Sequence, residues 1–291
     1  MKLSKLFSEG KFVVSGEVGP PKGTSSKEVL EGARLMKDCV DVVNVTDNQS
    51  AVMRLGSLAV SRLLKEDGIE PVFQMVCRDR NRIALQSDLL SAAALGIENV
   101  LALTGDHMIL GDHMAAKPVF DLDSVQLLQA AKGLNEGHDL EGHELDGTPG
   151  LCLGAVVNPG SDEVETQLIK MKKKIDAGAE FFQTQAVYEP DVFAKFMEKA
   201  GKLGAPVMVG IVPLKSAGMA RYMTENVAGV RVPKEMVQRI KKAPKADRKK
   251  VSTEMSIDIV AKTKEMCQGV HLMPLGWDDL VPEIAKGAGI A

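Results

Sequence analysis

The feature that most constrains this chain is a regular alternation of short apolar segments with longer helical patterns. Eight apolar segments predict strands, at residues 13–16, 40–45, 71–76, 99–103, 151–157, 181–184, 207–212 and 270–273. They lack a clean apolar–polar alternation, which is typical of parallel strands covered by helices. Parallel strands must be joined by crossover connections, which are usually helices.

A helical pattern follows each of these strands. The predicted helices cover residues 26–37, 55–65, 80–95, 124–134, 162–177, 191–200, 217–226 and 277–285, with further helical segments at 233–240 and 252–267. Eight strand–helix units in 291 residues match the usual size of a barrel of this kind. A doubly wound open sheet is the alternative, but no strand is followed by its glycine-rich G-x-G-x-x-G turn. The sequence therefore predicts an α/β fold, a single-domain (β/α)8 TIM barrel over residues 1–291.

Polar residues stand at the ends of six predicted strands. The first strand reaches Glu17 and then meets Pro20 and Pro21, which cannot continue a sheet ladder. The other polar strand ends are Thr46-Asp47-Asn48, Gln74, Thr104-Gly105-Asp106, Asn158 and Gln183-Thr184-Gln185. Each one alone is compatible with a simple turn residue. Together they predict a polar cup at the carboxyl ends of the strands, where barrel enzymes place their active sites.

Two long loops interrupt the alternation. Residues 105–121 contain Gly-Asp-His-Met twice and follow a strand, so we expect them at the active rim. Residues 136–150 precede a strand and are expected at the opposite end of the barrel.

The cup offers two carboxylates with different surroundings. Glu17 lies on an apolar strand, where burial favours the neutral acid, and is therefore the candidate proton donor. Asp106 lies beside Gly105 in a turn and is expected to stay ionised and to hold a cationic or N–H-rich group. Gln167, Lys170 and Lys174 share one stripe of the helix at 162–177 and could hold an anionic ligand at the rim. A solvated lysine face remains the alternative for that stripe.

Composition excludes several other functions. The net charge of −3 and an aromatic content of 4% argue against nucleic-acid binding. No apolar run is long enough to span a bilayer. The four cysteines are scattered, and the histidines at 107, 113, 138 and 143 match no established ligand spacing, so we expect no metal site. Free, buried thiols are typical of a cytoplasmic protein.

Several segments resemble, in order, the catalytic barrel of the 5,10-methylenetetrahydrofolate reductase family. They are 16–21 (Gly-Glu-Val-Gly-Pro-Pro), 44–46 (Asn-Val-Thr), 101–106 (Leu-Ala-Leu-Thr-Gly-Asp), 172–179 (Lys-Lys-Lys-Ile-Asp-Ala-Gly-Ala), 184–185 (Thr-Gln) and 210–213 (Gly-Ile-Val-Pro). Each segment is weak alone, whereas the ordered set is specific and spans nearly the whole chain. The chain is most similar to the bacterial type.

The resemblance implies a flavin-dependent reductase that converts methylenetetrahydrofolate to 5-methyltetrahydrofolate. Glu17 would protonate the folate to open its five-membered ring, Asp106 would lie near flavin and pterin, and Gln185 would contact the pterin. The positions implied for cofactor binding are Thr46, Gln74, Asp106, Asn158, Gln167, Lys170 and Lys174. Gln74 replaces a common histidine and Asn158 a tyrosine. FAD is the expected cofactor, with FMN as the alternative.

The resemblance also leaves the partners open. The electron donor would be NAD(P)H or a partner electron-transfer subunit, and an oligomer or hetero-complex is expected. Two other functions are compatible with the sequence: a pterin-binding methyltransferase barrel, and a non-catalytic subunit of a folate reductase complex.

Overall fold

Eight parallel strands close into a barrel, in chain order, in the computed structural model of residues 1–291. The strands are β1 (Val13–Val18), β2 (Val42–Val45), β3 (Pro71–Val76), β4 (Asn99–Leu103), β5 (Cys152–Val157), β6 (Phe181–Ala186), β7 (Val207–Ile211) and β8 (Gly269–Leu272). Pairing of β8 with β1 closes the barrel, with Ser15 opposite His271. The predicted (β/α)8 barrel is confirmed.

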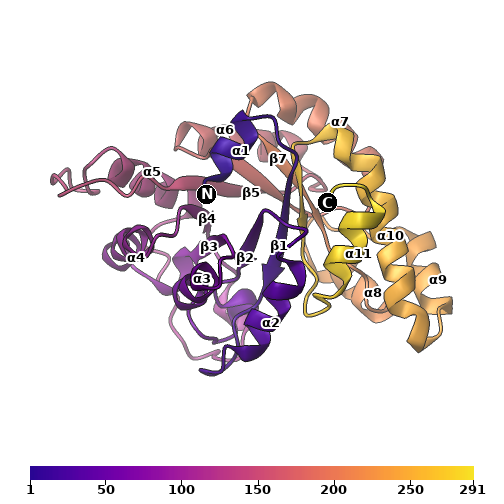
Figure 1. The fold of residues 1–291 in the computed structure, drawn as a ribbon. Coiled ribbons are helices and arrows are strands. Elements are labelled where there is room, and N and C mark those ends of the chain that lie inside the picture. Colours follow the sequence, from indigo (N-terminus) through magenta and orange to yellow (C-terminus); the bar gives the residue numbers. More distant parts are fainter.

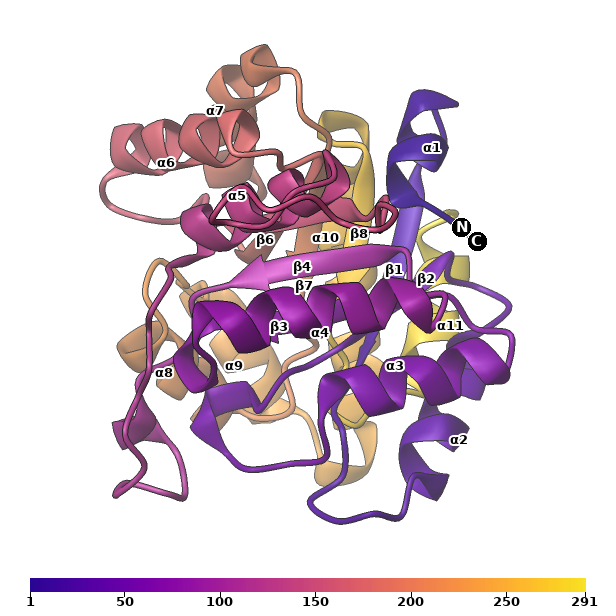
Figure 2. The ribbon, with the colours of Figure 1, turned by 90° about the vertical axis from the view of Figure 1, so that its left-hand side faces the viewer.

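Helices surround the barrel on its outside, apart from α1, which lies over the N-terminal end of the barrel (Figures 1 and 2). They are α1 (Leu3–Ser8), α2 (Lys27–Met36), α3 (Ser57–Glu66), α4 (Arg82–Ala94), α5 (Ser124–Asn135), α6 (Val164–Asp176), α7 (Pro190–Ala200), α8 (Ala217–Asn226), α9 (Lys234–Lys242), α10 (Arg248–Thr263) and α11 (Leu280–Gly287). The largest departures from prediction are both ends of α10, each four residues from the predicted range 252–267, and the start of α11. Helix α10 begins at Arg248, inside a charged run without apolar periodicity, and α11 begins only after a turn in which Leu280 N donates to Trp277 O. None of the helices has the length and apolar content needed to cross a membrane.

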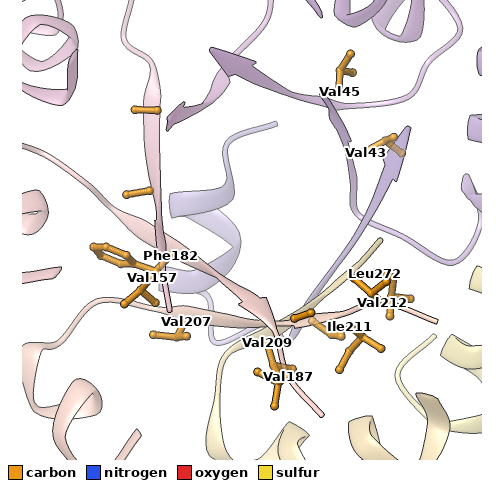
Figure 3. Close-up of a cluster of buried hydrophobic side chains, with 14 of the residues drawn as sticks. Val43, Val45, Val157, Phe182, Val187, Val207, Val209, Ile211, Val212 and Leu272 are labelled. Carbon is orange, nitrogen blue, oxygen red and sulfur yellow. The ribbon is translucent and has the colours of Figure 1, made fainter. Parts of the chain in front are cut away.

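The main core lies between the strands and the helices. Outward-facing strand residues are completely buried there, as Val43 and Val45 of β2, Phe182 of β6, and Val209 and Ile211 of β7 illustrate (Figure 3). Burial on both faces explains why the strands appear as continuous apolar runs in the sequence.

A second, smaller core fills the N-terminal end of the barrel interior. Its members come from α1 and from one inward position on each of seven strands: Leu3, Leu6, Val13, Val42, Val72, Leu101, Cys152, Phe181 and Met208. Asn99 fixes α1 over this end, because its Oδ1 accepts from Leu3 N at 2.8 Å. Gly154 is required beside Phe181, since a Cβ there would lie 2.2 Å from the ring.

The interior becomes polar one inward position further along the strands. Successive residues on a strand alternate between faces, so the residue two positions on occupies the same side. Five of the eight strands carry a buried polar residue at this level: Ser15, Asn44, Gln74, Gln183 and His271. The barrel therefore has an apolar base and a polar upper layer, and the polar layer opens at the carboxyl ends of the strands.

The two long loops lie at opposite ends, as predicted. The 105–121 loop packs on the β2–α3 connection at the carboxyl end, where Met53 N donates to Asp112 Oδ1 at 3.1 Å. The 136–150 loop extends beyond α5 (Figure 1) and returns near the N-terminus, where Gly150 approaches Lys2.

Candidate active site

A cavity of about 710 Å³ opens at the carboxyl ends of the strands, above the polar layer. Eight of the nine predicted site residues line it: Glu17, Gln74, Asp106, Asn158, Gln167, Lys170, Lys174 and Gln185. Its size falls in the usual range for small-molecule sites. The sequence prediction of a polar cup thus corresponds to one continuous cavity.

Glu17 lies in the wall of this cavity with only 8% of its surface exposed. Gln74 Nε2 donates to its Oε2 at 3.1 Å, and His271 Nε2 lies 3.4 Å from the same oxygen. Both protein contacts thus involve Oε2. The other oxygen, Oε1, is left for a molecule in the cavity.

A chain of buried polar groups lies behind Glu17. His271 Nδ1 is 2.8 Å from Ser15 Oγ, and Gln183 Nε2 donates to that hydroxyl at 3.4 Å. Gln183 and Asn44 form a reciprocal amide pair at 2.8 and 3.0 Å. Sequence reasoning missed His271 and Ser15. The period-two series Val13, Ser15, Glu17 is the signal that could have identified this polar side of the strand.

Thr46 does not line the cavity, unlike the other predicted site residues. Its side chain lies near Gly19 and is 2% exposed, and its Oγ1 has no hydrogen-bond partner. A buried hydroxyl without a partner is destabilising. Thr46 is therefore the one predicted ligand-binding residue whose hydrogen-bonding capacity is both buried and unused.

Helix α6 brings the basic stripe to the cavity. Gln167, Lys170, Lys173 and Lys174 all line it, whereas Lys172 pairs with Asp176 at 3.1 Å on the exposed side of the helix. Lys174 is half-buried, and its Nζ donates to Val156 O at 2.8 Å. Burial, followed by the nearby Lys170 charge, lowers the pKa of Lys174 to about 8. The stripe is therefore a concentrated positive wall of the cavity.

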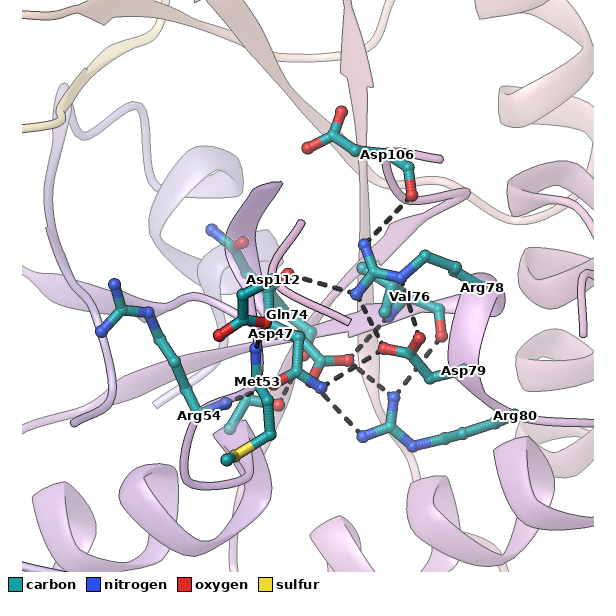
Figure 4. Close-up of polar contacts among 12 residues, drawn as sticks. Asp47, Met53, Arg54, Gln74, Val76, Arg78, Asp79, Arg80, Asp106 and Asp112 are labelled. Carbon is teal, nitrogen blue, oxygen red and sulfur yellow. Dashed lines mark hydrogen bonds and ion pairs between the residues drawn. The ribbon is translucent and has the colours of Figure 1, made fainter. Parts of the chain in front are cut away.

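Asp106 stands at the exposed edge of the cavity, and a hydrogen bond from Arg78 holds its main chain in place. The buried Arg78 guanidinium donates to Asp106 O at 3.2 Å and to Asn48 O at 3.1 Å, and it pairs with Asp79 at 2.7 Å (Figure 4). The Asp106 carboxylate points away from Arg78 in this view. Arg78, which sequence reasoning missed, thus holds together two loops that line the cavity.

The loop that Arg78 holds is strained. Asn48, Ser50 and Ala51 all have positive φ, at 43°, 56° and 57°, which is unfavourable for residues other than glycine. Asn48 Oδ1 accepts from Arg54 N at 3.0 Å and supports the turn. Asp47, beside them, is bound to Arg80 at 2.7 Å and to Val76 N at 3.0 Å, so its carboxylate has a structural task.

Asn158 and Gln185 line the cavity, and each forms a hydrogen bond with the main chain. Asn158 Nδ2 donates to Ala228 O at 2.7 Å and fixes the loop after α8 over the end of β5. The Gln185 side chain is exposed, and its Oε1 accepts from Ala186 N at 3.0 Å.

The arrangement favours acid–base chemistry and anion binding. No cluster of three His, Cys, Asp or Glu side chains has the geometry of a metal site. Burial raises the pKa of the Cys77 and Cys152 thiols to about 12, so neither supplies a thiolate nucleophile. The titratable groups that line the cavity are Glu17, Asp47, Arg78, Asp106, Asp123, Lys170, Lys173, Lys174 and His271.

Comparison with known proteins gives a consistent family. A methylenetetrahydrofolate reductase family model matches residues 2–289. Methylenetetrahydrofolate reductase 2 of Schizosaccharomyces pombe is 26% identical over 320 residues, covering 100% of this chain and 48% of its own length. The 5,10-methylenetetrahydrofolate reductase of Pectobacterium carotovorum is 24% identical over 291 residues, covering 97% of this chain and 92% of its own.

The chain spans about half the length of the first eukaryotic relatives it matches, at 48% and 44%. Among solved structures, an uncharacterized protein from Clostridium thermocellum that binds two copies of 5-methyl-5,6,7,8-tetrahydrofolic acid has a TM-score of 0.64 at 12% identity, with full coverage of both chains. That likeness supports the barrel fold. The family model, which covers nearly every residue, shows that the chain belongs to the methylenetetrahydrofolate reductase family.

Proposed function

We propose that this chain reduces 5,10-methylenetetrahydrofolate to 5-methyltetrahydrofolate, using a bound flavin. The observation that carries the proposal is the position of Glu17, a nearly buried acid in the wall of a large cavity whose protein contacts both involve Oε2. In strand order β1 lies across the barrel from β5, which leads into the basic helix α6. The acid on one side of the cavity could act on a neutral substrate, while the cationic wall on the other side could bind an anionic cofactor at the same time.

The residues of the cavity fit a flavin nucleotide. Lys170 and Lys174 supply positive charge for phosphate groups, and Gln167 adds an amide beside them. When bound, the flavin supplies the hydride that reduces the methylene carbon. We propose FAD as the cofactor. Identification of the flavin that is released when the protein is denatured would distinguish FAD from FMN.

Glu17 performs the acid step in this proposal. Its carboxylic proton moves from Oε1 to N10 of the folate, and the bond between N10 and the methylene carbon breaks with its electron pair going to N10. The methylene carbon is left as an iminium on N5, ready for hydride addition. General acid catalysis of this kind contributes about 10²- to 10⁴-fold in rate. Gln185 and the Asp106 carboxylate, both at the exposed edge, would contact the pterin.

The absorption spectrum of the purified chain tests the proposal. Flavin bands should bleach on reduction and return when methylenetetrahydrofolate is added. Glu17→Gln should keep the bound flavin and its reduction by the donor but lose reoxidation by the folate. A colourless protein that takes up neither FAD nor FMN would refute the flavin assignment and favour a pterin-binding methyltransferase. Normal folate turnover by Glu17→Gln would refute the role of Glu17.

A further inference from the structure

Helix α4 presents an apolar stripe to solvent on the outside of the barrel. Ile83, Ser87, Leu90 and Ala94 recur at the spacing of one helix face, and all four are exposed, Ile83 at 73%. In Figure 2, α4 crosses the front of the molecule, and no other element covers it. The outer face of a surface helix is normally charged or polar, so this stripe indicates a contact with another molecule.

The stripe is also free of charge. Arg82 and Asp88 are the only charged residues of α4. Arg82 pairs with Asp121 at 3.0 Å and Asp88 with Arg80 at 2.8 Å, so both charges are compensated within the chain. A two-fold interface brings a surface against itself, where an uncompensated charge would meet a charge of the same sign. An uncharged stripe avoids this repulsion and therefore suits a second copy of the chain better than a charged partner.

The order of large and small residues in the stripe is self-complementary. Large Ile83 and Leu90 alternate with small Ser87 and Ala94. If two copies of α4 lie antiparallel about a two-fold axis midway between Ser87 and Leu90, Ile83 faces Ala94 of the partner subunit. Ser87 then faces Leu90 of the partner subunit, so every large side chain meets a small one. In a parallel pair each residue would face its own copy, large against large.

We propose that this chain forms a two-fold homodimer through α4, with the two copies of the helix antiparallel. The 13 residues of α4 are about 20 Å long. With α3 and α5 about 10 Å away on either side, the contact face measures about 600 Å² on each partner, near the lower limit for a specific interface. The flanking helices supply a polar rim, since Arg62 pairs with Glu66 on α3 and Lys132 at the end of α5 pairs with Glu136.

This inference does not rest on the proposed function. No residue of α4 lines the cavity at the carboxyl ends of the strands. The dimer therefore leaves the cavity of each subunit open.

Sedimentation velocity of the full chain over a range of concentrations measures the association. We expect a dimer with a dissociation constant in the micromolar range. Ile83→Lys and Ala94→Glu, each alone, should raise this constant at least about tenfold, because each places a charge against an apolar side chain of the partner. Tyr222→Lys, on α8 across the barrel, replaces another exposed large side chain and should leave the constant unchanged.

A mixture of the two charged variants tests the antiparallel arrangement. In a heterodimer of Ile83→Lys and Ala94→Glu chains, the introduced ammonium lies opposite the introduced carboxylate, and the second contact keeps the native pair. The heterodimer should be at least about tenfold tighter than either homodimer. The two positions are about 16 Å apart along one helix, so no pair within a chain can produce this recovery.

Disulfide formation is a second measurement that introduces no charge. Oxidation of a mixture of Ser87→Cys and Leu90→Cys chains should give more cross-linked dimer than either variant alone. The wild type, whose cysteines are buried or half-buried, is the control and should give none.

Three results would overturn the inference. The first is a wild-type chain that stays monomeric at about 100 µM, well above a micromolar dissociation constant. The second is a dimer that Ile83→Lys and Ala94→Glu both leave intact. The third is a mixture that shows neither tighter association nor preferential cross-linking, which would exclude the antiparallel contact through α4.

Discussion

Replacing Lys174 with methionine should stabilise the ligand-free protein near neutral pH. Lys174 is half-buried on α6, and its charged form is disfavoured there, first by burial and then by Lys170. Methionine keeps much of the apolar stem and removes the charge. The same substitution should weaken binding of an anionic cofactor, because this ammonium belongs to the basic wall of the cavity.

The magnitude follows from the pKa of Lys174, which is lowered from 10.5 to about 8. Each pKa unit corresponds to about 1.4 kcal/mol, so the charged side chain costs about 3 kcal/mol of stability at pH 7. The folded pKa lies below the unfolded value, so this cost is fully present below pH 8. It is relieved as the pH rises toward 10.5, because the folded protein then binds fewer protons than the unfolded chain. At pH 9 about 2 kcal/mol should remain.

Urea unfolding of the wild type and Lys174→Met at pH 7, 8 and 9 measures this difference. The variant should be more stable, by at most about 3 kcal/mol because it also loses the hydrogen bond to Val156 O, and its advantage should shrink by about 1 kcal/mol by pH 9. Lys172→Met is the matched control. Its exposed pair with Asp176 should contribute less than about 1 kcal/mol, independent of pH in this range. A pH-independent advantage for Lys174→Met would refute the reasoning.

The same titration predicts how flavin affinity depends on pH. Only the protonated form of Lys174 attracts a phosphate, and its population falls about tenfold between pH 7 and pH 9. The dissociation constant of the wild type should therefore rise by up to about tenfold over this interval. Lys174→Met should bind more weakly at pH 7 and show a flat profile, which fluorescence titration of free flavin would measure.

Two further predictions concern buried polar groups. Thr46→Val should leave the ligand-free protein as stable as the wild type or about 1 kcal/mol more stable, because it removes a buried hydroxyl without a partner. A clear loss of stability in urea unfolding would mean that Oγ1 has a partner in solution. Arg78→Met should cost about 3 kcal/mol, since it removes the ion pair with Asp79 and the hydrogen bonds to the carbonyls of Asn48 and Asp106. Limited proteolysis should then cut the 105–121 loop faster than in the wild type, and an unchanged cleavage rate would show that Arg78 does not hold this loop.

The fold was predictable because the alternation of strands and helices is a local pattern. The expected bounds of β3 and β4, 71–76 and 99–103, agree with the structure, and the polar strand ends were recognised as one rim. His271 and Ser15 were missed because their contact depends on the closure of the barrel. They are 256 residues apart and meet only through the β1–β8 register. Arg78 was missed for a similar reason. Arginine is rarely buried, and the loop carbonyls that it binds are distant from it in the sequence, so its role could not be predicted without the structure.

The positions of the candidate residues suggest a division of tasks between rigid and adjustable parts of the barrel. Glu17 is on β1, which pairs with β2 and β8, and its Oε2 is bound by side chains of β3 and β8. Side chains on paired strands are held more precisely than side chains on loops. Precision matters most for the acid, because proton transfer depends more steeply on the distance between donor and acceptor than the strength of an ion pair does. Asp106, by contrast, is on a loop, and Lys170 is on an outer helix. Changes in the loops would therefore alter which cofactor or folate derivative is bound, whereas the strand-borne acid and the polar layer beneath it would keep the same chemistry.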